Sequence, residues 1–103
     1  MTISVLTPDR TIFTGAVSSV TLPGTDGSFQ LLDNHAPLVA SLDAGRVKLL
    51  TAAGTFRYYD AEAEAMTDGD TAGRQLSFSI ESGFVEVLNN EVNLLVQGAR
   101  NVR

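Results

Sequence analysis

The fold is decided by the stretch Leu76-Ser77-Phe78-Ser79-Ile80-Glu81, in which apolar residues occupy the even positions and polar residues the odd ones. This period of two is typical of a strand with one buried face, whereas a helix repeats every 3.6 residues. Segments 85–87 and 92–96 continue the alternation. Asn89-Asn90 lies between them, and because asparagine tolerates positive φ, this pair favours a two-residue hairpin turn. The last third of the chain is therefore predicted to be a strand followed by a β-hairpin.

Toward the N-terminus, short apolar runs are separated by turn-forming residues, such as Thr7-Pro8-Asp9 and Pro23-Gly24-Thr25-Asp26-Gly27. They predict further strands at residues 3–5, 17–22, 29–32, 47–51 and 56–59. Many short strands at this spacing predict an all-β fold, a two-sheet antiparallel β-sandwich or flattened barrel. The core is expected to contain residues in the apolar phases of these strands, namely Val20, Leu22, Phe78, Ile80, Val85, Val87, Val92 and Leu94.

Residues 60–74 break the alternation. The first half of this segment favours helix by propensity, but about two turns are too short to hold alone in water. The second half is acidic and rich in glycine, which is typical of a solvated loop. We therefore expect an acidic loop insertion, with at most one helical turn. The chain has 103 residues, which suits a single domain spanning residues 1–103.

Composition excludes several classes of function. The formal net charge is −5 and the seven basic residues are scattered, so a nucleic-acid partner is not expected. The chain contains no cysteine, which excludes disulfides and thiolate chemistry. No apolar run reaches the ~18 residues of a membrane span, and the N-terminus lacks the pattern of a signal peptide. The sequence therefore predicts a soluble cytoplasmic protein.

Candidate catalytic and metal-binding residues are few. His35 is the only histidine and lies near Asp33, so the two could form a general acid–base pair, but no nucleophile or further partner stands nearby. Residues 68–73 begin like a calcium loop, yet Ser79 stands at its twelfth position, where a bidentate glutamate is required. Residues 24–27 lack the lysine of a phosphate-binding loop. We therefore predict no catalytic, metal-binding or cofactor-binding residue and no enzymatic activity.

Two neighbouring leucines, Leu31 and Leu32, leave two interpretations open. Adjacent residues of a strand point to opposite faces, so one of the two side chains is expected to point outward. A strand that is covered on both faces would show the same continuous apolar run. The residues alone favour neither interpretation.

Three aromatic residues, Phe56, Tyr58 and Tyr59, support an alternative function. A free-standing β-sandwich that binds a small ligand or a carbohydrate could use them to stack on sugar rings. Phe56 and Tyr58 share one strand face and Tyr59 takes the other, however, and aromatic pairs in strands more often pack in a core.

Residues 22–38 read Leu-Pro-Gly-Thr-Asp-Gly-Ser-Phe-Gln-Leu-Leu-Asp-Asn-His-Ala-Pro-Leu, and they closely resemble the signature of ATP synthase epsilon subunits. In that family a Pro-Gly-x-x-Gly turn leads through a short apolar strand to a His-Ala-Pro-Leu turn. Thr7-Pro8, Phe13-Thr14-Gly15 and the segment 82–87 agree with the family as well. The resemblance covers nearly the whole chain except the insertion, and it implies the N-terminal β-sandwich domain of an epsilon subunit.

The resemblance implies a non-catalytic rotor subunit in the central stalk of an F-type ATP synthase, which couples proton or sodium translocation to ATP synthesis. Its partners would be the gamma subunit and the c-ring, and it would lie peripherally on the cytoplasmic face of the inner, or plasma, membrane. The resemblance places the c-ring interface at Ser28, Phe29, Gln30, Leu31 and Leu32. It places the gamma interface at His35, Leu38 and Ala40. Family members often carry an acid where Ser28 stands, which puts an ionic contact with the ring in doubt.

The sequence departs from the family in one respect. Members of the family commonly continue from the sandwich into a C-terminal helical hairpin that can inhibit ATP hydrolysis, whereas this sequence stops at Arg103. We expect neither inhibition nor ATP binding by that route.

Overall fold

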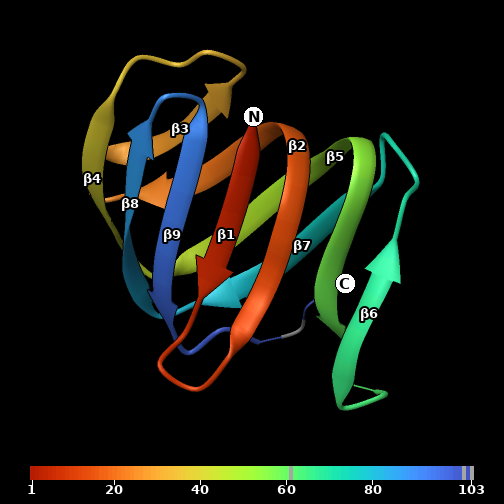
Figure 1. Cartoon of the computed structure of the whole chain (residues 1–103). Helices are drawn as coiled ribbons and strands as arrows, with labels where there is room; N and C mark the ends of the chain where they lie inside the picture. Colours follow the sequence, from red (N-terminus) through yellow and green to blue (C-terminus); the bar gives the residue numbers. More distant parts are fainter. Residues whose placement is uncertain (61, 101, 103) are drawn as a thin grey trace.

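The computed structural model describes residues 1–60, 62–100 and 102, which form an all-β sandwich (Figure 1). The strands are β1 (Thr2–Leu6), β2 (Thr11–Gly24), β3 (Gly27–Leu32), β4 (Leu38–Leu42), β5 (Gly45–Asp60), β6 (Ala65–Gly69), β7 (Gln75–Ile80), β8 (Ser82–Leu88) and β9 (Glu91–Gln97). None of the described residues forms a helix that is long and apolar enough to cross a membrane.

Two long strands connect the layers of the sandwich. The first part of β2 pairs with β1, and its second part pairs with β3. The first part of β5 pairs with β7, its last part pairs with β6, and β2 lies along most of its length. Strands β4, β8, β9 and β1 form the layer in front of β5 and β7 in Figure 1. Because β2 and β5 belong to both layers, the sheet is continuous, as the prediction of a flattened barrel requires.

One pairing differs from the expected antiparallel arrangement. β1 and β9 run parallel, with Thr2 opposite Glu91 and Leu6 opposite Leu95. The other strand pairs are antiparallel among the described residues. Hydrophobic alternation is the same in both kinds of pair, so the sequence pattern carries no information on this direction.

The predicted core is confirmed. All eight residues chosen from the strand phases are at most 2% exposed: Val20, Leu22, Phe78, Ile80, Val85, Val87, Val92 and Leu94. The predicted hairpin turn is confirmed as well, since Asn89 and Asn90 have φ of 52° and 61°. The alternation therefore identified the inward face of each of these strands.

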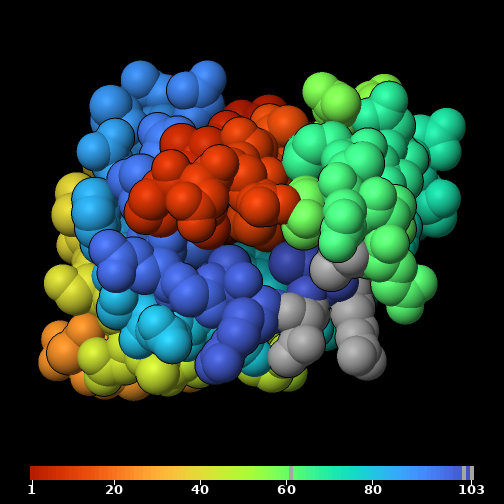
Figure 2. All heavy atoms as spheres, turned by 90° about the horizontal axis from the view of Figure 1, so that it is seen from below, coloured from red at the N-terminus to blue at the C-terminus, as the bar shows by residue number. Residues whose placement is uncertain are grey.

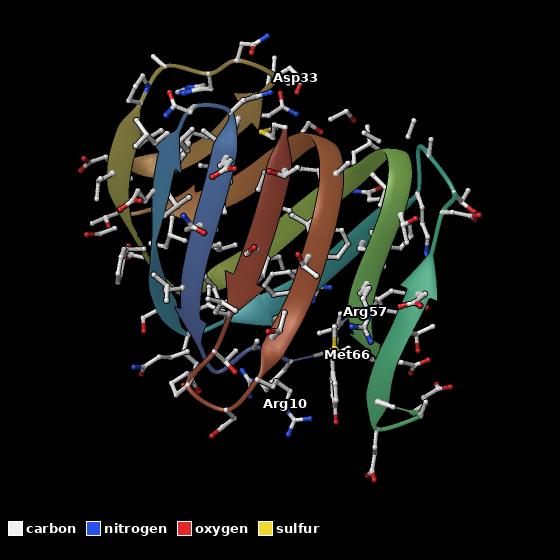
Figure 3. All side chains as sticks on the ribbon, in the orientation of Figure 1. Arg10, Asp33, Arg57 and Met66 are labelled. Carbon is white, nitrogen blue, oxygen red and sulfur yellow. The ribbon has the colours of Figure 1, made fainter. Side chains whose placement is uncertain are left out.

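The prediction that residues 60–74 form a loop is wrong for part of the segment. Residues 65–69 form strand β6, which pairs with the end of β5 from Phe56 to Asp60. The acidic side chain of Asp68 points to solvent, where it accepts a hydrogen bond from Nε of Arg57 at 2.7 Å. Figure 3 shows Arg57 on β5 beside Met66 on β6. Backbone pairing with β5 thus overrides the local preference of residues 65–69 for a loop. Residue 61 of the predicted insertion lies outside the described residues.

Candidate functional site

The segment predicted to face the c-ring is strand β3. It forms a tight hairpin with β2, in which Leu22 lies opposite Phe29 and Val20 lies opposite Leu31. Leu31 is fully buried, whereas Leu32 is 53% exposed. The interpretation in which one of the two leucines points outward is confirmed, and the doubly covered strand is wrong.

The other residues of β3 lie at the surface to different degrees. Ser28 and Gln30 are exposed, and Phe29 is half-buried. The Phe29 ring packs over Gly24, where an added Cβ would stand 2.7 Å from the ring. Ser28, Gln30 and Leu32 are therefore free for a partner, while Phe29 also supports the hairpin.

A groove of about 650 Å³ brings the two predicted interfaces together. One wall is the β2–β3 turn with Ser28 and Phe29, and the other is β4 with Leu38, Val39 and Ala40. The backbone amide of Thr25 donates to the carbonyl of Ser41 at 3.1 Å, which ties the turn to β4. Two of the five residues predicted for the c-ring, and two of the three predicted for gamma, thus line one groove.

His35 belongs to the loop between β3 and β4 and is half-buried. Its Nδ1 donates to the carbonyl of Ala36 at 2.8 Å. The backbone amide of Asn34 donates to Oδ1 of Asn90 at 2.8 Å, so the loop is held against the β8–β9 turn. His35 therefore lies beyond the end of β3, beside the β8–β9 turn, and it is not among the residues that line the β3–β4 groove.

The acid–base pair is not supported by the geometry. Asp33, labelled in Figure 3, accepts a hydrogen bond from the amino group of Met1 at 2.5 Å. This hydrogen bond and the charge of the amino group lower the pKa of the Asp33 carboxyl below its usual value. A carboxylate with a lowered pKa is a weaker base, and among the described residues no hydrogen bond joins it to His35.

Of the three aromatic residues of the carbohydrate alternative, Phe56 is buried, and Tyr58 and Tyr59 are half-buried. Phe56 is 1% exposed, and its ring stacks on a second buried ring, that of Phe13, at 5.7 Å between centroids. The guanidinium of Arg74 lies 4.7 Å from the Tyr58 ring, and that of Arg10 lies 4.2 Å from the Tyr59 ring. All three rings thus pack on the core, and an arginine covers each of the two tyrosine rings.

Two residues of the segment that resembles a calcium loop, Asp68 and Gly69, lie on β6 and pair with β5. Asp68 bonds Arg57, and an added Cβ on Gly69 would stand 2.5 Å from the Phe56 ring. Within residues 1–60, 62–100 and 102, no group of three or more His, Cys, Asp or Glu side chains could hold a metal ion.

Sequence reasoning missed an exposed apolar surface on the front layer. Val39 on β4 is 73% exposed, and Phe84 and Leu88 on β8 are 47% and 52% exposed. The signal was present in the alternation, because Phe84 and Leu88 share a strand phase with Glu86 and must point away from buried Val85.

The arrangement defines a class: a β-sandwich domain that exposes apolar side chains on β3, β4 and β8. The sequence pattern of the ATP synthase delta/epsilon chain β-sandwich domain matches residues 1–63. The ATP synthase epsilon chain of Chlorobium limicola is 36% identical, over 92% of this chain and 86% of that protein. The chain belongs to the ATP synthase delta/epsilon family, and it is similar to epsilon chains.

Further comparisons agree on the fold. The epsilon chain of Thermosynechococcus vestitus is 34% identical over 96% of this chain, which spans only 57% of that protein. A chain in the central stalk and c-ring structure of the Tetrahymena thermophila mitochondrial ATP synthase superposes with a TM-score of 0.68 at 16% identity, covering 98% of this chain and 66% of that one. A chain of the Euglena gracilis mitochondrial ATP synthase gives a TM-score of 0.69 at 18% identity, covering 95% and 51%.

Proposed function

We propose that the protein is a non-catalytic rotor subunit of the central stalk of an F-type ATP synthase. In this role it links the gamma subunit to the c-ring, so that ion translocation through the ring is coupled to ATP synthesis. The epsilon-chain relatives and the likeness of fold to stalk proteins support this role. The protein would lie at the cytoplasmic face of the membrane, held there through the complex.

The observation that carries the proposal is the β3–β4 groove. Two segments that lie apart in the sequence, around Ser28 and around Ala40, line it together. Exposed Leu32 and Val39 do not stabilise an isolated domain. A partner that covers such a side chain stabilises the complex by roughly 1.5–3 kcal/mol when burial is complete. A rotor subunit that touches two partners needs such adjoining surfaces.

Cysteine cross-linking tests this proposal directly, because the chain has no cysteine of its own. Each single-cysteine variant, Ser28→Cys or His35→Cys, is assembled into an ATP synthase that carries a second cysteine, either in the polar loop of the c subunit or on gamma. The assembled complex is then treated with a short bifunctional thiol reagent. We expect Ser28→Cys to join the c subunit and His35→Cys to join gamma.

The matched control is Ala65→Cys, an exposed residue on β6, which pairs with the end of β5 and lies away from β3 in Figure 1. It should join neither partner. The proposal is overturned if the tagged chain does not copurify with gamma and the c-ring, or if Ala65→Cys cross-links to either partner as efficiently as the other two variants.

A second variant tests whether the exposed leucine takes part. Leu32→Asp should weaken assembly without lowering the melting temperature by more than a few degrees, because this side chain is largely outside the core. Phe29→Asp is less informative, since the Phe29 ring also packs over Gly24. Normal assembly of Leu32→Asp would remove residues 28–32 from the interface.

A further inference from the structure

The β3–β4 loop, residues 33–37, is largely exposed, and it carries the half-buried His35 that the proposed function assigns to gamma. Two hydrogen bonds lie within this part of the chain. The His35 amide donates to the carbonyl of Leu32 at 3.1 Å, and the ring Nδ1 donates to the carbonyl of Ala36 at 2.8 Å. Both bonds join near neighbours, so they shape the loop without fixing its position on the sandwich.

Asn90, in the β8–β9 turn, supplies a contact of long range. Its side-chain Oδ1 accepts a hydrogen bond from the backbone amide of Asn34 at 2.8 Å, across 56 positions of the sequence. Its backbone carbonyl accepts from the amide of Thr2 at 3.2 Å, which joins the turn to the start of β1. Figure 1 shows the loop, the turn and the N-terminus at the same end of the sandwich. One side chain thus links the loop to a turn that is itself held by β1.

The first residue of the loop has a contact of its own. The Asp33 carboxylate, labelled in Figure 3, pairs with the amino group of Met1. That amino group is the main cause that lowers the pKa of the Asp33 carboxyl, and the Asn90 side chain adds a smaller effect in the same direction. The Asp33 side chain is 60% exposed, so solvent screens the ion pair. The position of the residues that follow, Asn34 and His35, therefore depends chiefly on Asn90.

The opposite end of the sandwich, which Figure 2 shows from below, fixes a segment differently. There the backbones of Arg100 and Ser79 exchange two hydrogen bonds, one in each direction, both at 2.9 Å. Such bonds persist whatever side chains are present. Among the described residues, no backbone–backbone hydrogen bond joins residues 33–37 to β8, β9 or the turn between them. The position of this loop therefore depends on which side chain stands at residue 90.

We propose that Asn90 is a positioning residue, whose side chain holds the β3–β4 loop so that His35 can meet gamma. The inference rests on the proposed function and adds a residue that lies outside both predicted interfaces. Asn89 and Asn90 both have positive φ, 52° and 61°, a conformation that glycine would also adopt. Among the described residues only Asn90 of this pair has a side chain hydrogen-bonded to the loop. The turn geometry alone does not require asparagine at 90, whereas the contact with Asn34 does.

Two glycine variants separate the side chain from the turn. Asn90→Gly keeps a residue that tolerates positive φ and removes Oδ1, and Asn89→Gly is the matched control in the same turn. Hydrogen exchange of the Asn34 amide is measured in the otherwise unchanged chain. It should accelerate about threefold to tenfold in Asn90→Gly, the effect of one net hydrogen bond, and stay within about twofold of the wild type in Asn89→Gly. Both melting temperatures should stay within a few degrees of the wild type, because no core side chain changes.

The second measurement is the cross-linking rate in the assembled ATP synthase. Asn90→Gly should slow the reaction of His35→Cys with gamma by about threefold or more, while the reaction of Ser28→Cys with the c subunit stays unchanged. Asn89→Gly should slow neither reaction.

The outcomes separate this inference from the proposed function. The inference is overturned if Asn90→Gly leaves the Asn34 exchange rate or the His35→Cys cross-link as in the wild type. It is also overturned if both cross-links weaken together with the melting temperature, because Asn90 would then act only on general stability. Absence of any cross-link from His35→Cys to gamma in a chain that keeps Asn90 overturns the gamma contact of the proposed function itself, and the inference with it.

Discussion

Replacing each of the two neighbouring leucines with alanine tests how the β3 strand is oriented. Leu31 is fully buried, so Leu31→Ala removes core contacts and leaves a cavity that costs about 2–5 kcal/mol of unfolding free energy. For a domain of this size a loss of ~3 kcal/mol corresponds to roughly 12–24 °C in the melting temperature. Leu32 is 53% exposed, so its side chain contributes less than half of its full burial free energy to stability. Leu32→Ala should therefore lower the free energy of unfolding by less than about 1.5 kcal/mol.

The assay is thermal and urea unfolding of both variants, followed by circular dichroism and compared with the wild type. The intrinsic cost of alanine in a strand is common to both variants, so the difference between them reports burial. We expect Leu31→Ala to be less stable than Leu32→Ala by at least about 0.5 kcal/mol. Equal losses, or a larger loss for Leu32→Ala, would refute the assignment of faces on β3 and the docking argument built on it.

Two further predictions concern the β5–β6 region. Thr51 is 2% exposed, and its hydroxyl donates to the carbonyl of Thr71 at 2.6 Å and accepts from the amide of Arg74 at 2.8 Å. Thr51→Val removes both hydrogen bonds, so it should lower the free energy of unfolding, measured in urea, by about 1–3 kcal/mol. An unchanged stability would show that water replaces both bonds. Gly69→Ala should cost about 1–3 kcal/mol by thermal melting, because the new methyl group meets the Phe56 ring. A melting curve that matches the wild type would show that β6 does not pack on this ring.

The sequence by itself was sufficient for the fold class and for the inward faces of β2, β7, β8 and β9, whereas it left the orientation of Leu31 and Leu32 open. Alternation in segments such as 76–81 is a local property, and burial of one apolar phase has the same physical cause whatever strands lie on either side. The turn at Asn89-Asn90 could be predicted for the same reason, because the φ preference of a residue belongs to that residue. The resemblance of residues 22–38 to epsilon subunits added the family, which the comparisons show.

Only the tertiary structure decided features that depend on pairing between distant segments. The parallel contact of β1 with β9 and the strand at 65–69 exist because a neighbouring edge supplies hydrogen-bond partners, and neither leaves a mark in local periodicity. The β3–β4 groove and the neighbouring positions of Phe84, Leu95 and Leu6 on three adjacent strands likewise depend on the register between strands. A sequence pattern shows that a side chain points outward, but which exposed side chains meet is determined when the sheet closes.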